Sequence, residues 1–266
     1  MGELVDVVRE GGVARVVMQR AGNNSIAADL MSELRAAFEE LGADPDCRAV
    51  VLQSAYERYF SVGADLGAMG GMDRSAPDAE ERIVEMMRAS GAGFDAIAAC
   101  PKPVIARING HALGGGCELA LCCDYRIMVE DGRSRIGQTE SALGIIPGAG
   151  GTQRLVRLIG RARALPLLYE SVRLSAAEAE TVGLVNRAVP SDGLDAAVDE
   201  LAGRLASAAT LAIALIKDAV NRGQDRTLEE GLEIEARNFA RSALSEDAVI
   251  GIVSFLQKTK PEFKGR

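Results

Sequence analysis

The sequence has little of what several classes of functional site require. Among its 266 residues there is one histidine, His111, and the five cysteines form no CxxC pair. A zinc site would therefore need an unusual set of ligands. A serine or cysteine hydrolase needs a base beside its nucleophile, and no GxSxG sequence is present to expose a serine. We therefore interpret His111 as a turn residue, and the cysteines as small apolar core residues in a reducing compartment.

An excess of positive charge is also absent. The formal net charge is −8, which argues against a nucleic-acid groove because such grooves need a clustered basic face. One group of arginines has roughly helical spacing, and we interpret it as a solvent-exposed face: Arg154, Arg157, Arg161 and Arg163. We expect no nucleic-acid partner.

Long apolar runs and nucleotide motifs are missing as well. No uncharged apolar run approaches the roughly 18 residues that span a bilayer, and the first residues lack the cationic start and apolar core of a signal peptide. We expect a cytoplasmic protein with no membrane partner. The glycine-rich turn at 148–152 lacks the lysine of a GxxxxGK[ST] loop, and Gln153 replaces the last glycine of GxGxxG. Classical nucleotide binding is therefore not expected.

The sequence does contain the alternating pattern of an α/β protein. A strand is predicted at 13–18 and another at 49–53. Between them, a helix beginning at Ser25 and stopping at Gly42 places four apolar residues on one face: Leu30, Leu34, Phe38 and Leu41. These elements form a β-α-β start. Residues 67–90 are interpreted either as a mobile wall of a pocket or as a plain exposed helix and loop.

The middle of the chain is predicted to build a site. A buried strand at 103–109 is broken by the glycines at 114–116, and an apolar helix at 117–123 precedes a strand at 125–129 and a turn at 130–134. From Leu194 onward the pattern is helical, with further helices near 210–221, 227–243 and 245–258. This helical tail can pack on another subunit or on its own core.

Two glutamates beside glycine-rich turns are the main candidate functional residues. Glu118 follows three glycines at the start of a helix, and Glu140 precedes the glycine-rich segment 144–151. A carboxyl group near exposed backbone amides can transfer protons while the amides stabilise an oxyanion. Each glutamate also has a simpler interpretation, Glu118 as a first-turn helix charge and Glu140 as a surface carboxylate.

Four ordered segments carry a resemblance that covers nearly the whole chain. They are residues 60–66, 101–124, 137–155 and 179–186, and through them the sequence resembles the crotonase (enoyl-CoA hydratase/isomerase) superfamily. The resemblance implies an α/β fold, a crotonase-type spiral of ββα units over residues 1–195. It also implies a C-terminal helical oligomerisation region over residues 196–266, and assembly as a homotrimer or a dimer of trimers.

The resemblance also implies a reaction. The backbone amides of Ala64 and Gly115 correspond to the oxyanion hole that binds the thioester oxygen of an acyl-CoA. Glu118 and Glu140 correspond to the two carboxyls that add water reversibly across the C2=C3 bond of a 2-enoyl-CoA to give 3-hydroxyacyl-CoA. Glu118 is expected to activate the water and Glu140 to supply the proton at C2. The same enolate would also serve an isomerase or another lyase, and a non-catalytic binding protein is a further alternative.

Coenzyme A enters as part of the substrate, so the resemblance implies no separate cofactor and no metal. Two departures concern Glu140: Thr139 stands where many members have proline, and the turn at 131–135 is longer, so either could displace this carboxyl. The residues expected to bind the acyl-CoA are Ser61, Val62, Gly63, Ala64, Asp65, Leu66, Gly114, Gly115, Phe263 and Lys264.

Overall fold

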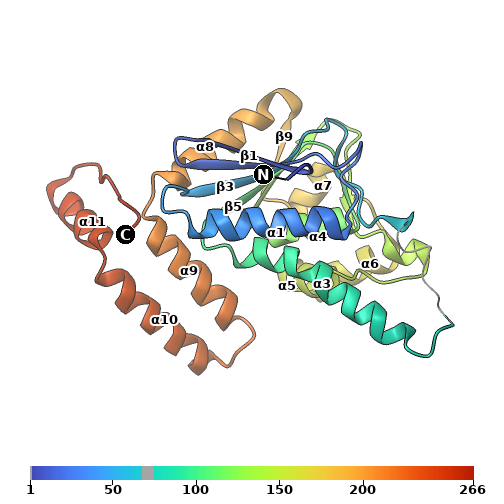
Figure 1. The fold of residues 1–266 in the computed structure, drawn as a ribbon. Coiled ribbons are helices and arrows are strands. Elements are labelled where there is room, and N and C mark those ends of the chain that lie inside the picture. Colours follow the sequence, from blue (N-terminus) through green and yellow to red (C-terminus); the bar gives the residue numbers. More distant parts are fainter. Residues whose placement is uncertain (1, 68–74) are drawn as a thin grey trace.

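Two sheets organise the protein (Figure 1). The computed structural model describes residues 2–67 and 75–266. A six-stranded sheet has the order β1-β2-β3-β5-β7-β9, in which only the β1–β2 pair is antiparallel. Its strands are β1 Val5–Glu10, β2 Val13–Met18, β3 Ala49–Ser54, β5 Val104–Ile108, β7 Tyr125–Glu130 and β9 Arg187–Pro190. A smaller parallel sheet has the order β4-β6-β8, with β4 Tyr59–Ser61, β6 His111–Leu113 and β8 Ile136–Gly137.

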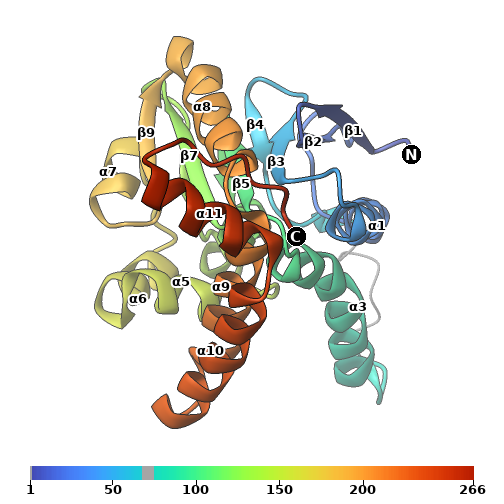
Figure 2. The ribbon, with the colours of Figure 1, turned by 90° about the vertical axis from the view of Figure 1, so that its left-hand side faces the viewer.

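Helices cover both faces of the larger sheet and continue beyond it at the C-terminal end (Figure 2). The helices that precede β9 in the chain are α1 Ala28–Ala43, α3 Ala79–Ala99, α4 Gly115–Cys122, η1 Glu140–Leu143, α5 Gly151–Ile159, α6 Arg161–Tyr169 and α7 Ala176–Thr181. Those that follow β9 are η2 Ser191–Gly193, α8 Leu194–Ala206, α9 Thr210–Gly223, α10 Leu228–Ala243 and α11 Glu246–Gln257.

The central strands divide their side chains between two apolar cores. On β3, Val50 and Leu52 join the core that contains α1, α3 and α4, whereas Val51 between them joins the core beneath α8. Alternate residues of a strand point to opposite faces, so a strand covered on both sides is apolar throughout. α8 lies on the second face, where Leu194 and Val198 pack against the strands.

The predicted β-α-β start is confirmed, with corrections at both ends of its helix, which begins at Ala28 and not at Ser25. The strands at 13–18 and 49–54 pair in parallel, and α1 buries the four predicted residues of its apolar face. The helix continues through Gly42 to Ala43, so Gly42 does not stop it. A Cβ atom on Gly42 would lie 3.1 Å from the ring of Pro101. The absent side chain therefore makes room for a neighbouring segment.

Two further predictions were wrong in detail. His111 lies in strand β6 and not in a turn, and its Nδ1 accepts a hydrogen bond from the backbone amide of Arg135 at 3.2 Å. The arginines do not share one helical face, because Gly160 separates α5 from α6. Arg154 is half-buried and pairs with Asp95 at 3.0 Å.

Residues 67–90 fall partly within a long helix. Residues 68–74 lie outside the described residues, so the prediction of a pocket wall there is not addressed. Residues 79–90 form the N-terminal half of α3, which projects from the body of the molecule in Figures 1 and 2. This half agrees with the expectation of an exposed helix, since Ile83, Val84 and Met86 are exposed.

All five cysteines are buried and unpaired. Burial raises the pKa of each thiol, which keeps these groups neutral: Cys47, Cys100, Cys117, Cys122 and Cys123. They pack with the aliphatic residues of the main core, as the sequence predicted.

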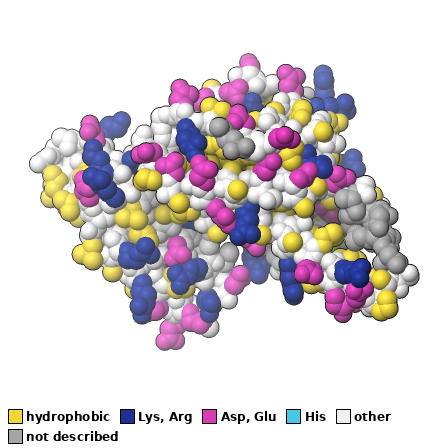
Figure 3. All heavy atoms as spheres, viewed as in Figure 1, with side chains coloured by type: hydrophobic (Ala, Val, Ile, Leu, Met, Phe, Trp, Pro, Cys, Tyr) yellow, Lys and Arg dark blue, Asp and Glu magenta, His cyan; other side chains and the backbone are white. Residues whose placement is uncertain are grey.

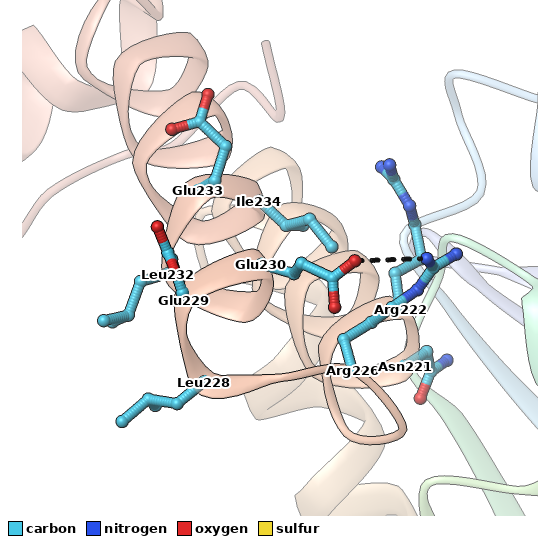
Figure 4. A pocket seen from close by; sticks show the side chains of 9 residues that line it. All are labelled: Asn221, Arg222, Arg226, Leu228, Glu229, Glu230, Leu232, Glu233 and Ile234. Carbon is cyan, nitrogen blue, oxygen red and sulfur yellow. Dashed lines mark ion pairs between the residues drawn. The ribbon is translucent and has the colours of Figure 1, made fainter.

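The C-terminal helices expose large apolar side chains. α9, α10 and α11 extend to one side of the sheet, and yellow side chains lie over them at the left of the space-filling view (Figure 3). A groove of about 1220 Å³ lies beside α9 and α10. In Figure 4, Leu228 and Leu232 point outward from α10, while Glu230 points toward Arg226, its ion-pair partner at 3.7 Å. Across the described part of the chain, none of the helices has the length and apolar composition needed to cross a membrane.

Candidate active site

The three short strands of the smaller sheet bring the candidate residues together. β4, β6 and β8 are parallel, so their carboxyl ends meet at one edge. The loop 62–66 follows β4, Gly114 and Gly115 follow β6, and Glu140 lies three residues after β8. Ligand sites in α/β proteins occur at the carboxyl ends of parallel strands. The predicted residues from three distant segments therefore occupy one edge of one sheet.

Glu118 is buried and bound by two backbone amides. It lies in the first turn of α4 with 3% of its surface exposed. Its Oε1 accepts hydrogen bonds from the amides of Ala149 and Gly151, both at 2.7 Å. Burial raises the pKa of Glu118, and the two amides and the nearby Arg154 oppose this effect by favouring the carboxylate. Glu118 is thus a buried carboxyl whose ionised form is specifically solvated.

Glu140 has the opposite environment. Its Oε1 lies against Gly114, where an added Cβ atom would be only 2.6 Å away, and its buried Oε2 has no hydrogen-bond partner among the described residues. Burial and the charge of Glu118 raise the pKa of Glu140 to about 7, although backbone amides partly oppose the shift. Thr139 and the longer turn therefore leave this carboxyl beside the glycine turn and within electrostatic range of Glu118.

The amides of Ala64 and Gly115 lie close to each other. A Cβ atom on Gly115 would be 3.7 Å from the Ala64 nitrogen. Gly63 makes this approach possible: its φ is +91°, and a Cβ atom there would lie 2.8 Å from the carbonyl oxygen of Leu113 and 3.0 Å from the nitrogen of Gly115. Within the described structure, neither the Ala64 nor the Gly115 amide donates a backbone hydrogen bond to another residue. Two neighbouring amides are therefore available to one acceptor.

Ser61 at the end of β4 and the residues of the loop that follows it differ in exposure. The hydroxyl of Ser61 is buried and donates to the carbonyl oxygen of Asn24 at 2.7 Å. Val62 and Asp65 are half-buried, whereas Ala64 and Leu66 are exposed. Ser61 thus holds the loop in place, and the exposed part of the loop begins at Ala64.

Phe263 and Lys264 lie in the tail that follows α11. The ring of Phe263 packs beside Gly251 of α11, and its carbonyl oxygen accepts a hydrogen bond from Arg48 at 3.1 Å. The carboxylate of Asp247 accepts hydrogen bonds from the amides of Lys264 and Gly265. These contacts place the tail against Arg48 and α11.

Several residues around the site were not found from the sequence. Gln138 is 1% exposed and lies against Gly151, and neither polar atom of its amide is paired with a described residue. Arg154 donates to the carbonyl oxygen of Ala149 at 2.7 Å and so braces the turn that binds Glu118. Met87 of α3 contacts the same turn at Gly148. Gln138 and Arg154 lie within the motif segment 137–155, whereas Met87 lies outside the four motif segments.

The chemistry available at this edge is proton transfer beside a pair of amide donors. Burial raises the pKa of both carboxyls, but two backbone amides stabilise the carboxylate of Glu118, whereas Oε2 of Glu140 has no partner among the described residues. Such an unequal pair can accept and deliver a proton. In the part of the chain that the structure describes, no group of three Cys, His, Asp or Glu side chains is arranged to hold a metal ion.

The fold is shared with solved enoyl-CoA hydratase structures. The structure of an enoyl-CoA hydratase from Bacillus anthracis superposes with a TM-score of 0.91 and 36% sequence identity, covering 99% of this chain and 100% of that one. The crotonase-type fold predicted from the sequence is therefore confirmed, including its C-terminal helices.

The sequence comparisons identify the family. Residues 8–266 match the model of the enoyl-CoA hydratase/isomerase family, and the chain belongs to this family of enzymes. A probable enoyl-CoA hydratase of Rhizobium meliloti is 39% identical over 265 residues, which cover 99% of each chain. A crotonyl-CoA hydratase of Syntrophomonas wolfei is 39% identical over 240 residues, covering 90% of this chain and 89% of its own.

Proposed function

We propose that the protein is a hydro-lyase that adds water reversibly across the C2=C3 bond of a 2-enoyl-CoA, giving 3-hydroxyacyl-CoA. The observation that carries this proposal is a pair of carboxyls near the carboxyl ends of β4, β6 and β8 that differ in their hydrogen bonding. Glu118 receives two amide hydrogen bonds, whereas Glu140 has a buried oxygen without a partner among the described residues. The hydratase names of relatives across the full chain support the same reaction.

In this proposal the thioester oxygen accepts hydrogen bonds from the Ala64 and Gly115 amides. Negative charge develops on that oxygen as water attacks C3, because the electrons of the double bond move toward the carbonyl. Backbone donors fixed in advance stabilise this charge, and one such donor typically contributes about 3 kcal/mol to a transition state. The positive φ of Gly63 allows the close approach that places the two amides together.

The two glutamates then complete the addition of water. Ionised Glu118 takes a proton from the attacking water, whose oxygen bonds to C3, and protonated Glu140 delivers a proton to C2. One O–H bond of water breaks, one C–O and one C–H bond form, and the proton on the glutamate pair has moved from Glu140 to Glu118. Because one carboxyl must be ionised and the other protonated, catalysis requires the singly protonated pair, and the two carboxyls titrate as a unit.

The loop at 61–66 and the turn at Gly114 and Gly115 are proposed to bind the acyl-CoA. The exposed apolar surfaces of α10 and α11 are proposed to join copies of the chain into a trimer or a dimer of trimers. In such an assembly Phe263 and Lys264 would meet the acyl-CoA site of a neighbouring copy, since their contacts within one chain are with Arg48 and α11.

The direct test is turnover of crotonyl-CoA, followed by loss of the absorbance of its conjugated thioester. Glu118→Gln and Glu140→Gln keep the size of each side chain and remove its acid–base chemistry, so both should lower kcat by at least about 100-fold. The matched control is Glu178→Gln, at an exposed carboxyl in the capping box of α7. Undiminished activity in both active-site variants would overturn the mechanism.

Double-bond isomerisation is the alternative within the family. It uses the same amides, but it shifts a proton between carbons and needs no attacking water. The paired carboxyls therefore favour hydration. Product analysis after adding a 3-enoyl-CoA distinguishes the two reactions, because an isomerase would give 2-enoyl-CoA without 3-hydroxyacyl-CoA.

A further inference from the structure

Arg20 connects three segments beside the candidate active site. Its Nε donates to Asp29 at 3.0 Å in the first turn of α1, its Nη1 donates to the hydroxyl of Ser25, and its Nη2 donates to Asp65 at 3.1 Å. The Arg20 side chain is 19% exposed. The bonds to Ser25 and Asp65 are partly buried, whereas the bond to Asp29 is exposed.

The direction of the Ala64 amide is set by Ile26. The amide of Ile26 donates to the carbonyl oxygen of Gly63 at 2.7 Å, and the amide of Asp65 donates to the carbonyl oxygen of Ile26 at 2.9 Å. In a trans peptide unit the C=O and N–H groups point in opposite directions. Because the Gly63 carbonyl faces Ile26, the N–H of Ala64 in the same peptide unit points away from Ile26.

Arg20 bonds to the sequence neighbours of Ile26 and of Ala64. Ser25 directly precedes Ile26, and Asp65 directly follows Ala64. The Asp65 carboxylate is held on both sides, since Oδ2 accepts from Arg20 and Oδ1 accepts from the amide of Gly67 at 3.1 Å. One guanidinium therefore fixes the two backbone segments against each other.

We propose that Arg20 is a positioning residue for the Ala64 amide, acting through Asp65 and Ser25. This inference rests on the proposed function, in which that amide binds the thioester oxygen. It gives the Asp65 carboxylate the role of holding the loop in position. A displacement of about 1 Å at a catalytic group can slow a reaction about 100-fold, even when the altered residue does not touch the substrate.

The first test compares steady-state kinetics with crotonyl-CoA. Arg20→Gln and Asp65→Asn should each lower kcat by about 10- to 100-fold, with KM changed less than threefold, because the lost stabilisation belongs to the transition state. The double variant should be no slower than the slower single variant, since both break one link. Arg20→Lys should be intermediate, because an ammonium cannot bridge the three acceptors as a guanidinium does.

The matched control is Arg9→Gln. Arg9 also pairs with acidic residues of the α1 region, Glu40 at 2.5 Å and Asp44 at 3.6 Å, but it lies on β1 and contacts no part of the 61–66 loop that the structure describes. This variant should keep the kcat of the unmodified protein. A comparable loss of kcat in Arg9→Gln would show that breaking any ion pair with the α1 region slows the reaction. That result would overturn the specific role of Arg20.

A second readout does not require hydration. Acetoacetyl-CoA has an enolate form that absorbs in the ultraviolet, and two amides aimed at the thioester oxygen should increase its population on the protein. Arg20→Gln and Asp65→Asn should reduce this absorbance at saturating ligand. If the unmodified protein stabilises the enolate but hydrates no enoyl-CoA, the proposed function is wrong. The effect of the two substitutions on the enolate absorbance then still tests the role of Arg20.

The inference fails if Arg20→Gln and Asp65→Asn both retain the kcat and the enolate absorbance of the unmodified protein. An unmodified protein that neither hydrates crotonyl-CoA nor stabilises the enolate would overturn both proposals. Should Arg20→Gln not fold, Asp65→Asn decides the question, because it leaves Arg20 bonded to Asp29 and Ser25.

Discussion

At the scale of single residues, Glu140 is the group whose environment departs most from that of an ordinary surface carboxyl. Burial and the nearby charge of Glu118 raise its pKa to about 7, whereas the Glu118 carboxylate is stabilised by two amides. Two adjacent carboxyls whose ionised forms are stabilised to different extents can serve as a base and an acid. This asymmetry depends on backbone groups of the 149–151 turn more than on other side chains.

The raised pKa of Glu140 predicts an alkaline limit to activity. The singly protonated pair loses its proton as pH rises through about 7, so kcat/KM for hydration should fall above that pH. Dehydration of the 3-hydroxyacyl-CoA should show the same limit, because the hydration reaction neither releases nor takes up a proton overall and its equilibrium constant does not depend on pH. Rate measurements in both directions between pH 5 and 9 check this, and a flat profile in that range would contradict the assignment.

The same shift predicts a stabilising substitution. A carboxyl with a raised pKa favours folding while it is protonated, and this contribution is lost as pH rises from its ordinary pKa of 4.5 through about 7. Glutamine resembles the protonated form at every pH. Glu140→Gln should therefore gain stability relative to the unmodified protein between pH 5 and 8, as measured by urea unfolding at each pH. A stability difference that does not change with pH would argue against burial of this carboxyl.

At the scale of elements, the sequence predicted the long strands and helices because their periodicity extends over many residues. The strand at 13–18, helix α1 and the strand at 49–54 follow from apolar spacing alone. The strands of the smaller sheet contain two or three residues, which is too few for an alternating pattern to be recognised. β6 was accordingly interpreted as a turn around His111.

Only part of the candidate site could be predicted from the sequence. Glu118, Glu140, Ala64 and Gly115 lie in motif segments and could be named from the sequence. Arg20 could not, because it acts on Asp65, 45 residues away, through a side-chain contact. Spacing along the chain carries no information about such a contact.

The turn after β4 gives a prediction at this scale. Gly63→Ala would place a Cβ atom 2.8 Å from the carbonyl of Leu113, so Ala64 and Gly115 must separate and kcat should fall about 100-fold. The control is Gly183→Ala, where φ is +81° but nothing lies within 4 Å. Both variants should lose about 1 kcal/mol of stability through backbone strain. Crotonyl-CoA kinetics and thermal unfolding separate the two effects, and equal kcat values would contradict the close-approach argument.

At the scale of the whole molecule, the C-terminal helices leave a large apolar surface uncovered in one chain. Leu228 is 80% exposed, Leu244 89% and Phe255 83%. Monomeric proteins seldom expose so many large apolar residues together. The surface therefore supports the proposed assembly of several copies.

Phe255→Asp combined with Leu244→Asp should dissociate the assembly, because two charges would enter an apolar interface. Light scattering after size-exclusion chromatography should give the mass of a monomer. The control is Val8→Asp, an exposed apolar residue of β1 that lies outside this surface. An unchanged mass in the double variant would show that these residues are not at the interface.

The small β4-β6-β8 sheet also has a consequence for the order in which the protein acquires activity. Its strands are separated by about fifty and about twenty residues along the chain, so each pairing requires closure of a long loop. Local helices form quickly and independently, whereas such distant pairings form slowly. A refolding chain should regain its helical circular dichroism before any turnover, because the two amides and two carboxyls meet only when the last of these short strands is in register.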